Sequence, residues 1–417
     1  MITNRFDSGD DLDTAKWVKL ALWQEGGYED MLKVLLSDEI AAHCPGSATA
    51  SNSDEQCILG PARMMVASMD KDLLKAVIRG NLALQAKSNS VIKDRLDDLY
   101  VEAKDKPSIY YQLLVDDNGH SPAPNELGTI LDTMEEYVNA TNHTLANEID
   151  NVKTPHIDLL QSQGGYRKYT WTSSGTKDSN TYSEFQSAAK VKEITRLIEK
   201  VRARLSGLPP QHQNKSLKHP LVHVAYSNRS QSRLKKHANH SYSHPALNLA
   251  SAIAAVLFTH TTLPKLYKMT QYIIYICHTA SHASLSEIVL TRLAEGYMGN
   301  GGGFSRYPAA RSAGSALKTS EQEWDNCAQY AIERSPLREN LKSDIERLKK
   351  KLPDAQGKKP SLLMKSAGRA LHARAQEMNE RTKAGRSEAG PEIHQKAADI
   401  IAEFRKRHPI PEDEANV

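Results

Sequence analysis

The stretch from Leu221 to His237 has the sequence LVHVAYSNRSQSRLKKH, and it changes from mainly apolar to mainly basic residues halfway along. Its first part, Leu221 to Tyr226, is apolar and rich in β-branched and aromatic residues, which predicts a strand. The basic part from Ser232 to His240 predicts a short helix. A strand followed directly by a helix indicates an α/β unit in the middle of the chain.

Elements of the same kind lie on both sides of this stretch. The apolar segment Pro245–Thr259 has Pro at its first turn, which predicts a helix. Tyr267–Cys277 contains the run YIIYI and predicts a strand, and Leu285–Tyr297 predicts another helix. On the N-terminal side, Arg167–Thr172 is rich in aromatic and β-branched residues and predicts a further strand.

The two ends of the chain have a helical pattern. From Leu12 to about Val138, and again from about Thr319 onward, apolar residues recur at helical spacing. We therefore predict an α+β class, a mostly helical chain with a small central α/β domain. The expected domains are a helical domain at 1–153, the α/β domain at 154–318 and a charged helical region at 319–417.

Charge is distributed unevenly, although the formal net charge is only +4 over 417 residues. No Asp or Glu lies between Glu199 and Glu287, and that span contains many Lys and Arg residues. A basic surface of this kind favours a polyanion partner. The predicted nucleic-acid-binding residues are Lys215, Lys218, Arg229, Lys235, Lys236 and Asn300. A basic face that only keeps the protein in solution is the alternative.

The spacing of three residues adds to this pattern. Arg233 lies eight residues after Ala225 and begins the sequence RLKKH, which ends at His237, and Glu287 follows the third predicted strand. The order of elements and these residues resemble the GIY-YIG nuclease family. That family has Tyr-x-Gly at the end of its second strand, then an Arg eight residues later that often begins R-L-x-x-H, and one Glu on a later helix.

The resemblance extends over roughly Tyr166 to Arg311. His223-Val-Ala225 occupies the Tyr-x-Gly position, so both motif residues are replaced. Tyr166 and Tyr169 are the candidates for the tyrosine of the first motif. Asn300, followed by three glycines and Phe304, is similar to the tail of the restriction-enzyme branch.

This resemblance implies metal-dependent hydrolysis of phosphodiesters. Arg233 would bind phosphate through its planar fork of donors, and Glu287 would hold one Mg²⁺, the expected cofactor. A tyrosine activates the attacking water in the family, which implies a role for Tyr166 or Tyr226. His223 or His237 can take a proton near neutral pH and would assist or replace it.

Two alternatives stay open. The first is a catalytically inactive helical interaction or scaffold protein that binds nucleic acid or protein partners. The second is a transition-metal site, because several histidines have helical spacing. These histidines are His237, His240, His244, His278 and His282.

The remaining sequence features concern location and partners. The four cysteines form no C-x-x-C pair and fit reduced thiols inside a cell. No run approaches the roughly 20 apolar residues of a spanning helix, so no membrane partner is expected. The basic clusters Lys349–Lys351 and Arg405–Arg407 suggest a nuclear location. We expect an intracellular protein that binds nucleic acid, DNA in preference to RNA, with a protein partner at the helical regions.

Overall fold

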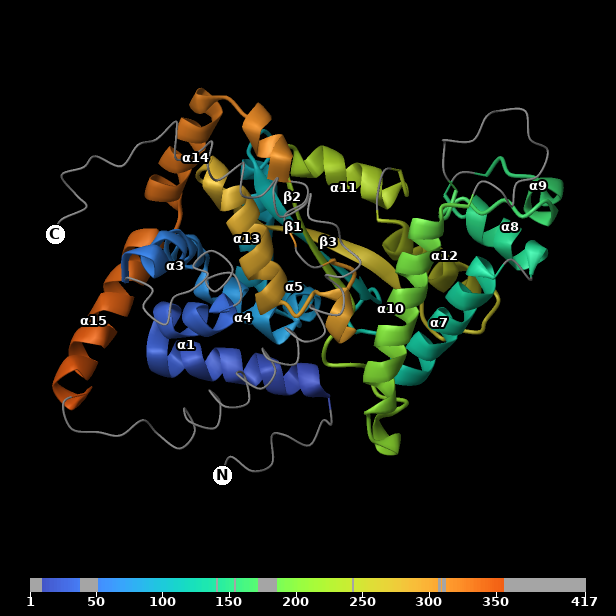
Figure 1. The fold of residues 1–417 in the computed structure, drawn as a ribbon, viewed down its shortest axis with the longest axis horizontal. Helices are drawn as coiled ribbons and strands as arrows, with labels where there is room; N and C mark the ends of the chain where they lie inside the picture. Colours follow the sequence, from blue (N-terminus) through green and yellow to red (C-terminus); the bar gives the residue numbers. More distant parts are fainter. Residues whose placement is uncertain are drawn as a thin grey trace. The chain divides into compact units, whose positions relative to one another are not determined.

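The computed structural model describes residues 10–37, 52–139, 142–153, 155–171, 186–241, 244–306, 309 and 313–355. Helices predominate, with one small sheet, which confirms the predicted α+β class (Figure 1). The α-helices are α1 (Asp11–Leu35), α3 (Asn52–Ala67), α4 (Lys71–Arg79), α5 (Leu82–Ser88), α6 (Ser90–Glu102), α7 (Pro124–Val138), α8 (His143–Asn151), α9 (Leu159–Gln163), α10 (Ala188–Ser206), α11 (Ser230–Ala238), α12 (Pro245–Thr259), α13 (Ala280–Leu293), α14 (Glu321–Arg334) and α15 (Leu337–Ala355). Short 3₁₀ helices are η3 (Pro210–His212), η4 (Met298–Asn300) and η5 (Ala313–Lys318).

The sheet has three antiparallel strands in the order β2-β1-β3. These strands are β1 (Ser108–Val115), β2 (Val222–Ser227) and β3 (Lys268–Ile276). Tyr110 is paired with Ala225 of β2 and with Ile273 of β3. Since side chains alternate along a strand, Tyr110 lies on one face of β1 and Tyr111 on the other.

The central strand is the main correction to the predicted elements. β1 lies in the region that the pattern assigned to helices, and all eight of its residues are buried. A strand buried on both faces loses the polar-apolar alternation that identifies an amphipathic strand. The predicted strand Arg167–Thr172 is also wrong, because its described residues form a turn with a single bridge from Trp171 to Gln186. Pairing of β1 with β2 and β3 crosses the predicted boundary between residues 153 and 154.

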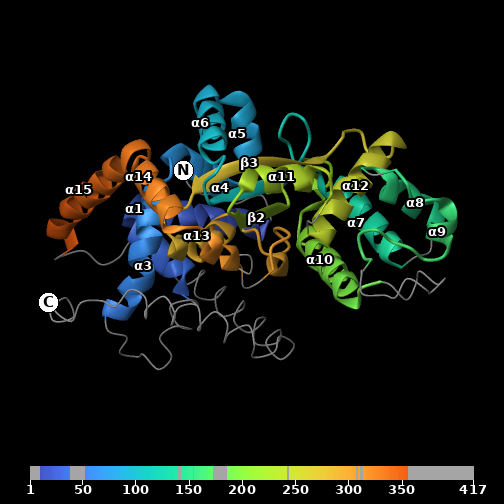
Figure 2. The same cartoon turned by 90° about the horizontal axis from the view of Figure 1, so that it is seen from above.

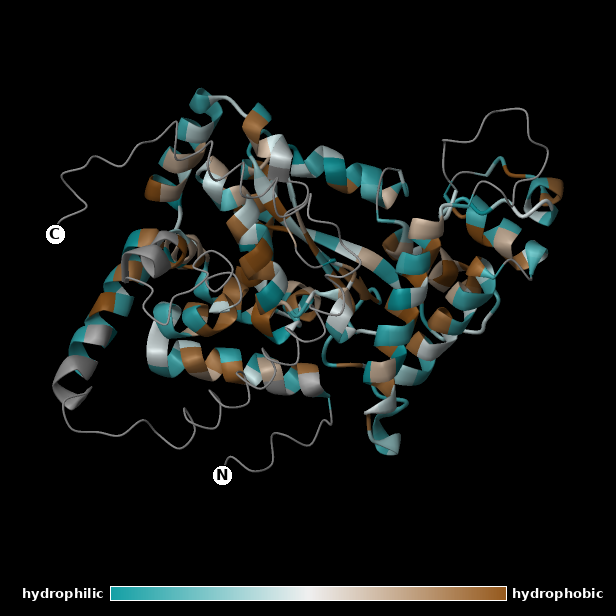
Figure 3. Cartoon of the chain, viewed as in Figure 1, coloured by the Kyte–Doolittle hydropathy of each residue, from teal (hydrophilic) through white to brown (hydrophobic). Residues whose placement is uncertain are grey.

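Helix α11 covers the face of the sheet on which Tyr110 lies. It contacts all three strands, and its buried residues Ser230, Leu234 and His237 follow the helical period. The Ser230 hydroxyl lies 2.8 Å from that of Ser108 at the start of β1. The rest of α11 is hydrophilic, as Figure 3 shows. The narrow row of buried residues that includes His237 therefore determines how α11 packs on the sheet.

The segment between β1 and β2 contains helices α7 to α10. Figures 1 and 2 show α7, α8, α10 and α12 side by side, and these helices share one hydrophobic core. Ile130, Ile198 and Ile253 are among its fully or almost fully buried members. Helices α7 to α10 lie between β1 and β2 in the sequence, although the two strands are paired in the sheet.

Buried ion pairs join α1 to the rest of the protein. Arg204 of α10 binds Asp10 at 2.7 Å, and Lys19 of α1 binds Glu295 at 2.6 Å. Since all four side chains are at least nine-tenths buried, removing one partner would leave an uncompensated charge. The N-terminal helix is thus tied to the segment that follows α13.

All labelled helices and strands belong to one unit, which comprises residues 1–36 and 46–359. The predicted helices at Ser361–Thr382 and Pro391–Arg407, with the basic cluster Arg405–Arg407, lie outside the described residues. Among the residues that are described, no helix is long and apolar enough to cross a membrane.

Candidate active site

Tyr110 and His237 form the centre of the site. The Tyr110 hydroxyl lies 3.0 Å from His237 Nε2, and the ring centroids are 5.4 Å apart. Both side chains are buried, with exposures of 2% and 3%. β1 contributes the tyrosine and the buried stripe of α11 the histidine, so the contact depends on how that helix packs on the sheet.

Two charged groups act on the Tyr110 hydroxyl. Burial raises its pKa to about 12, the Arg233 guanidinium opposes that rise, and the Glu287 carboxylate adds to it. Arg233 lies one helical turn before His237 on α11. Arg233 and His237 thus lie beside Tyr110, a tyrosine that the sequence had not singled out, and Glu287 is near enough to affect the pKa of its hydroxyl.

Glu287 is held by backbone. It lies on α13 with 7% of its surface exposed, and its Oε2 accepts a hydrogen bond of 3.2 Å from the Tyr226 N–H. The Tyr226 hydroxyl donates instead to Asn228 Oδ1 at 2.6 Å. Tyr226 therefore contributes its main chain to the site, not the hydroxyl that the sequence analysis proposed.

His223 faces the same centre from β2. Its ring lies 6.2 Å from Tyr110 and 6.3 Å from His237, measured between centroids. Its Nδ1 lies 3.4 Å from the Ser305 hydroxyl. Burial first, then the neighbouring His244 and His237, lower the pKa of His223 well below the usual range.

The imidazoles of this site are therefore neutral near pH 7. Burial lowers the pKa of His237 to about 3, and the positive charge of Arg233 contributes to the same shift. A neutral Nε2 can accept the proton of the Tyr110 hydroxyl, whereas an imidazolium cannot. Because the pKa of Tyr110 lies far above that of His237, the proton between them rests on the Tyr110 oxygen, and the pair suits the relay of a proton from a group that approaches Tyr110.

His223 is supported from behind by His244 and Glu193. The His223 and His244 rings are 5.6 Å apart, and His244 Nε2 lies 2.7 Å from Glu193 Oε1. Arg306 forms an ion pair with the same carboxylate. Helix α10, the start of α12 and the chain that follows α13 therefore meet next to His223 of β2.

The tyrosines proposed for the first motif lie elsewhere. Tyr166 packs on Trp171, with centroids 6.2 Å apart, and the Tyr169 hydroxyl lies 2.8 Å from His240 Nδ1. Tyr110 takes the place beside His237 instead. The signal that could have pointed to it is the run SIYYQLLV at 108–115, which contains aromatic and β-branched residues.

Asn300 orders the glycine-rich loop. Its Nδ2 donates to Glu295 Oε2 at 2.6 Å, and its Oδ1 accepts from the Gly302 N–H at 3.0 Å. Glu295 in turn binds Lys19. These contacts give Asn300 a structural role in the loop.

The acid-free span is partly neutralised in three dimensions. Acids from the N-terminal part of the chain pair with five of its cations, namely Arg202, Arg204, Lys218, Lys265 and Lys268. Among the predicted contacts, Lys215, Arg229, Lys235 and Lys236 are exposed. Hydrogen bonds from the Ser320 backbone and side chain lower the pKa of the Glu323 carboxyl, and the nearby Arg229 adds a smaller part. Lys235 and Lys236 lie on α11, Arg229 is the residue before it, and Lys215 follows η3.

Of the groups near Tyr110, the Glu287 carboxylate is the type of ligand that Mg²⁺ prefers. Glu287 offers a carboxylate, and Mg²⁺ is commonly held by one or two carboxylates together with waters and substrate phosphates. The described residues contain no group of three His, Cys, Asp or Glu side chains placed to hold a metal ion. The histidines suggested for zinc are instead hydrogen-bonded or packed in pairs, such as His278 and His282 at 5.4 Å.

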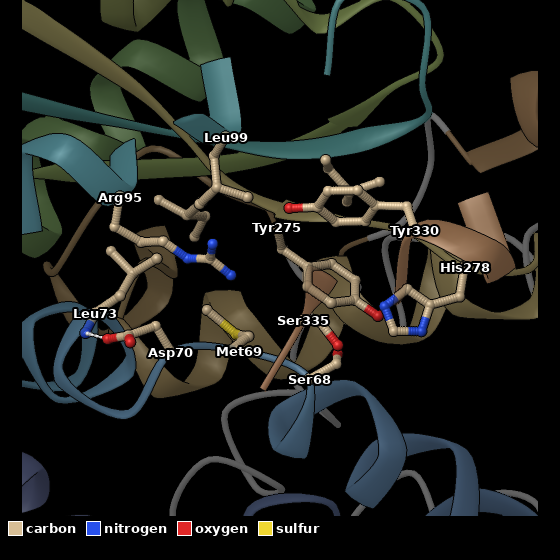
Figure 4. Close-up of a pocket in the computed structure, with 12 residues that line it drawn as sticks. Ser68, Met69, Asp70, Leu73, Arg95, Leu99, Tyr275, His278, Tyr330 and Ser335 are labelled. Atoms are coloured by element: carbon tan, nitrogen blue, oxygen red, sulfur yellow. Dashed lines mark hydrogen bonds between the residues drawn. The ribbon is translucent and has the colours of Figure 1, made fainter. Parts of the chain in front are cut away.

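Two cavities lie away from Tyr110. The first, of about 10 Å³, lies between β3, α4, α6 and α14, and Arg95, Tyr275 and His278 line it (Figure 4). That volume suits about one water molecule. The second lies between α1, α4 and α15.

Comparison with protein-family models, curated proteins and solved structures finds no match.

Proposed function

We propose that this chain is a divergent GIY-YIG-type nuclease that hydrolyses phosphodiester bonds in nucleic acid, DNA in preference to RNA, with the help of Mg²⁺. The main support is the convergence of Tyr110, His237, Arg233 and Glu287 from β1, α11 and α13. In this proposal Ser108-Ile-Tyr110 takes the place of the first motif, instead of Tyr166.

The proposed chemistry begins with proton removal. The Tyr110 oxygen takes a proton from the attacking water in the same step in which its own proton passes to neutral His237, so that hydroxide attacks phosphorus without a free tyrosinate. Arg233 binds the non-bridging phosphate oxygens through its guanidinium. Glu287 would hold the metal ion, which when bound would supply Lewis-acid stabilisation of the leaving alkoxide. His223 lies beside Tyr110 and His237 and stays neutral in this step.

We predict that Glu287→Gln lowers the Mg²⁺-dependent cleavage rate by about 100-fold, because the amide keeps an oxygen ligand but loses the charge that holds the cation. The measurement compares single- and double-stranded DNA and RNA, with Mg²⁺ or with EDTA. Glu339→Gln is the matched control, since Glu339 is an exposed glutamate on α15. Equal cleavage rates for wild type and Glu287→Gln would show that the Glu287 carboxylate does not hold the metal ion.

The same assay tests the inactive alternative. Binding without cleavage, weakening steeply as salt increases, would mean that the chain binds nucleic acid as a degenerate relative. Neither binding nor cleavage would reject the proposal altogether. A protein partner at the helical regions and a nuclear location stay predictions.

A further inference from the structure

The cavity between α1, α4 and α15 has a volume of about 200 Å³. A single water needs roughly 10–15 Å³ by this kind of measure, so the space suits a small molecule. Trp23 and Tyr28 of α1, Lys71 and Lys75 of α4, and Asp344 and Arg347 of α15 line it. None of the residues around Tyr110 belongs to its lining, so this cavity is separate from the candidate active site.

A kink in α1 shapes one wall of the cavity. Gly27 interrupts the helix with φ 89° and ψ −168°, and the Trp23 carbonyl accepts a hydrogen bond of 2.8 Å from Arg347 Nη1. A Cβ on Gly27 would collide with the Arg347 and Asp344 side chains. Glycine is thus required here both for its backbone conformation and for the close approach of α15.

The Tyr28 hydroxyl has no hydrogen-bond partner among the residues that the structure describes. Tyr28 is only 1% exposed and stacks on Trp23 at 5.6 Å, and within the described part of the chain its hydroxyl makes no hydrogen bond. Buried hydroxyls in folded proteins are nearly always hydrogen-bonded to protein, water or ligand. Because Tyr28 lines the cavity, an occupant that comes close to its buried hydroxyl would supply the missing acceptor.

The charges around the cavity favour an anion. Lys71, Lys75 and Arg347 outnumber the one lining carboxylate, Asp344. That carboxylate already binds Arg347 and, at 3.1 Å, Arg63 Nη2. Lys71 Nζ has a contact of 3.3 Å with the Ser343 hydroxyl, and Lys75 pairs with the exposed Asp72 at 2.9 Å. Donors thus exceed available acceptors in the lining.

We propose that this cavity binds a small organic phosphate. A phosphate group has enough acceptor oxygens for Lys71, Lys75 and the Tyr28 hydroxyl together. The remaining volume, beside Trp23, takes the organic part of the molecule. The proposal does not depend on nuclease activity.

The experiment titrates the full chain with inorganic phosphate, adenosine 5′-monophosphate and citrate, by calorimetry and by thermal unfolding. We expect the nucleotide to bind most tightly, and Lys71→Met with Lys75→Met to weaken it by about tenfold or more, because two charge-assisted contacts are lost. Tyr28→Phe should weaken binding too, while the free variant keeps or raises its melting temperature, because the lost hydroxyl has no partner in the described chain.

Lys93→Met is the matched control, because Lys93 is an exposed lysine paired with Asp97 at 2.7 Å on α6 and does not line the cavity. It should bind the nucleotide like wild type. Absence of phosphate and nucleotide binding at millimolar concentration would overturn the proposal, as would binding of citrate alone. Wild-type affinity in both the double-lysine and Tyr28→Phe variants would place any binding elsewhere. If Tyr28→Phe fails to fold, the lysine variants decide.

Discussion

Replacing Tyr110 with Phe is expected to lower the rate of phosphodiester cleavage by about a thousandfold. The change removes the hydroxyl that lies 3.0 Å from His237 Nε2 and keeps the ring that packs between the sheet and α11. In the proposed mechanism that oxygen takes the proton from the attacking water. Because the proposal assigns substrate binding to Arg233 and the exposed lysines, the rate constant should fall while the affinity for nucleic acid changes little.

Tyr111→Phe provides the matched control for this loss. Tyr111 is the next residue of β1, lies on the opposite face of the strand and is fully buried. Its hydroxyl makes no hydrogen bond within the described chain. The same chemical change should therefore leave both cleavage and folding close to wild type. Equal loss in the two variants would indicate a general effect on the sheet, and full activity in Tyr110→Phe would exclude the proposed base.

Local sequence signals were enough to predict the elements around the site. The helix predicted at Pro245–Thr259 has those bounds in the structure, and the strand predicted at Leu221–Tyr226 is shifted by one residue at each end. Proline at a first turn and a short β-branched run act over a few neighbouring residues. Such signals need no knowledge of the rest of the chain.

The missing part of the prediction was non-local. β1 is identified as a strand by its pairing with β2, more than a hundred positions later in the sequence, and by burial on both faces. Tyr110 becomes a site residue only because that pairing and the packing of α11 bring it to His237. Similarly, Asp10 and Asp13 neutralise Arg204 and Lys218 of the acid-free span from the other end of the chain. The charge pattern along the sequence therefore predicted a larger basic surface than the structure has, because it could not show these ion pairs.

Acidification is expected to destabilise the fold steeply between about pH 6.5 and pH 4. Burial is the first cause that lowers the pKa in seven histidines, namely His219, His223, His237, His240, His244, His278 and His282. In this pH range the unfolded chain binds more protons at these sites than the folded chain does, so the free energy of unfolding falls as pH falls. The raised pKa of Asp150, about 6, opposes this trend with a single group.

The size of the expected loss in the free energy of unfolding follows from the number of buried histidines. Each buried neutral histidine contributes up to about 1.4 kcal/mol per pH unit below the unfolded pKa of roughly 6.5. Together they should lower the free energy of unfolding by several kcal/mol between pH 7.5 and pH 5.5, a large part of the roughly 5–15 kcal/mol typical of a folded protein. Denaturant unfolding at pH 7.5, 6.5, 5.5 and 4.5 measures this slope.

A single substitution can test the cause. His278 is buried against Tyr275 and His282, so His278→Phe keeps an aromatic ring there and removes one group that must be protonated on unfolding. We expect this variant to recover about 1 kcal/mol relative to wild type at pH 5.5 and to gain nothing at pH 7.5. The exposed His156, changed to Asn, is the control and should follow the wild-type curve. A stability that is flat from pH 7.5 to pH 4.5 would show that these imidazoles are not held neutral by burial.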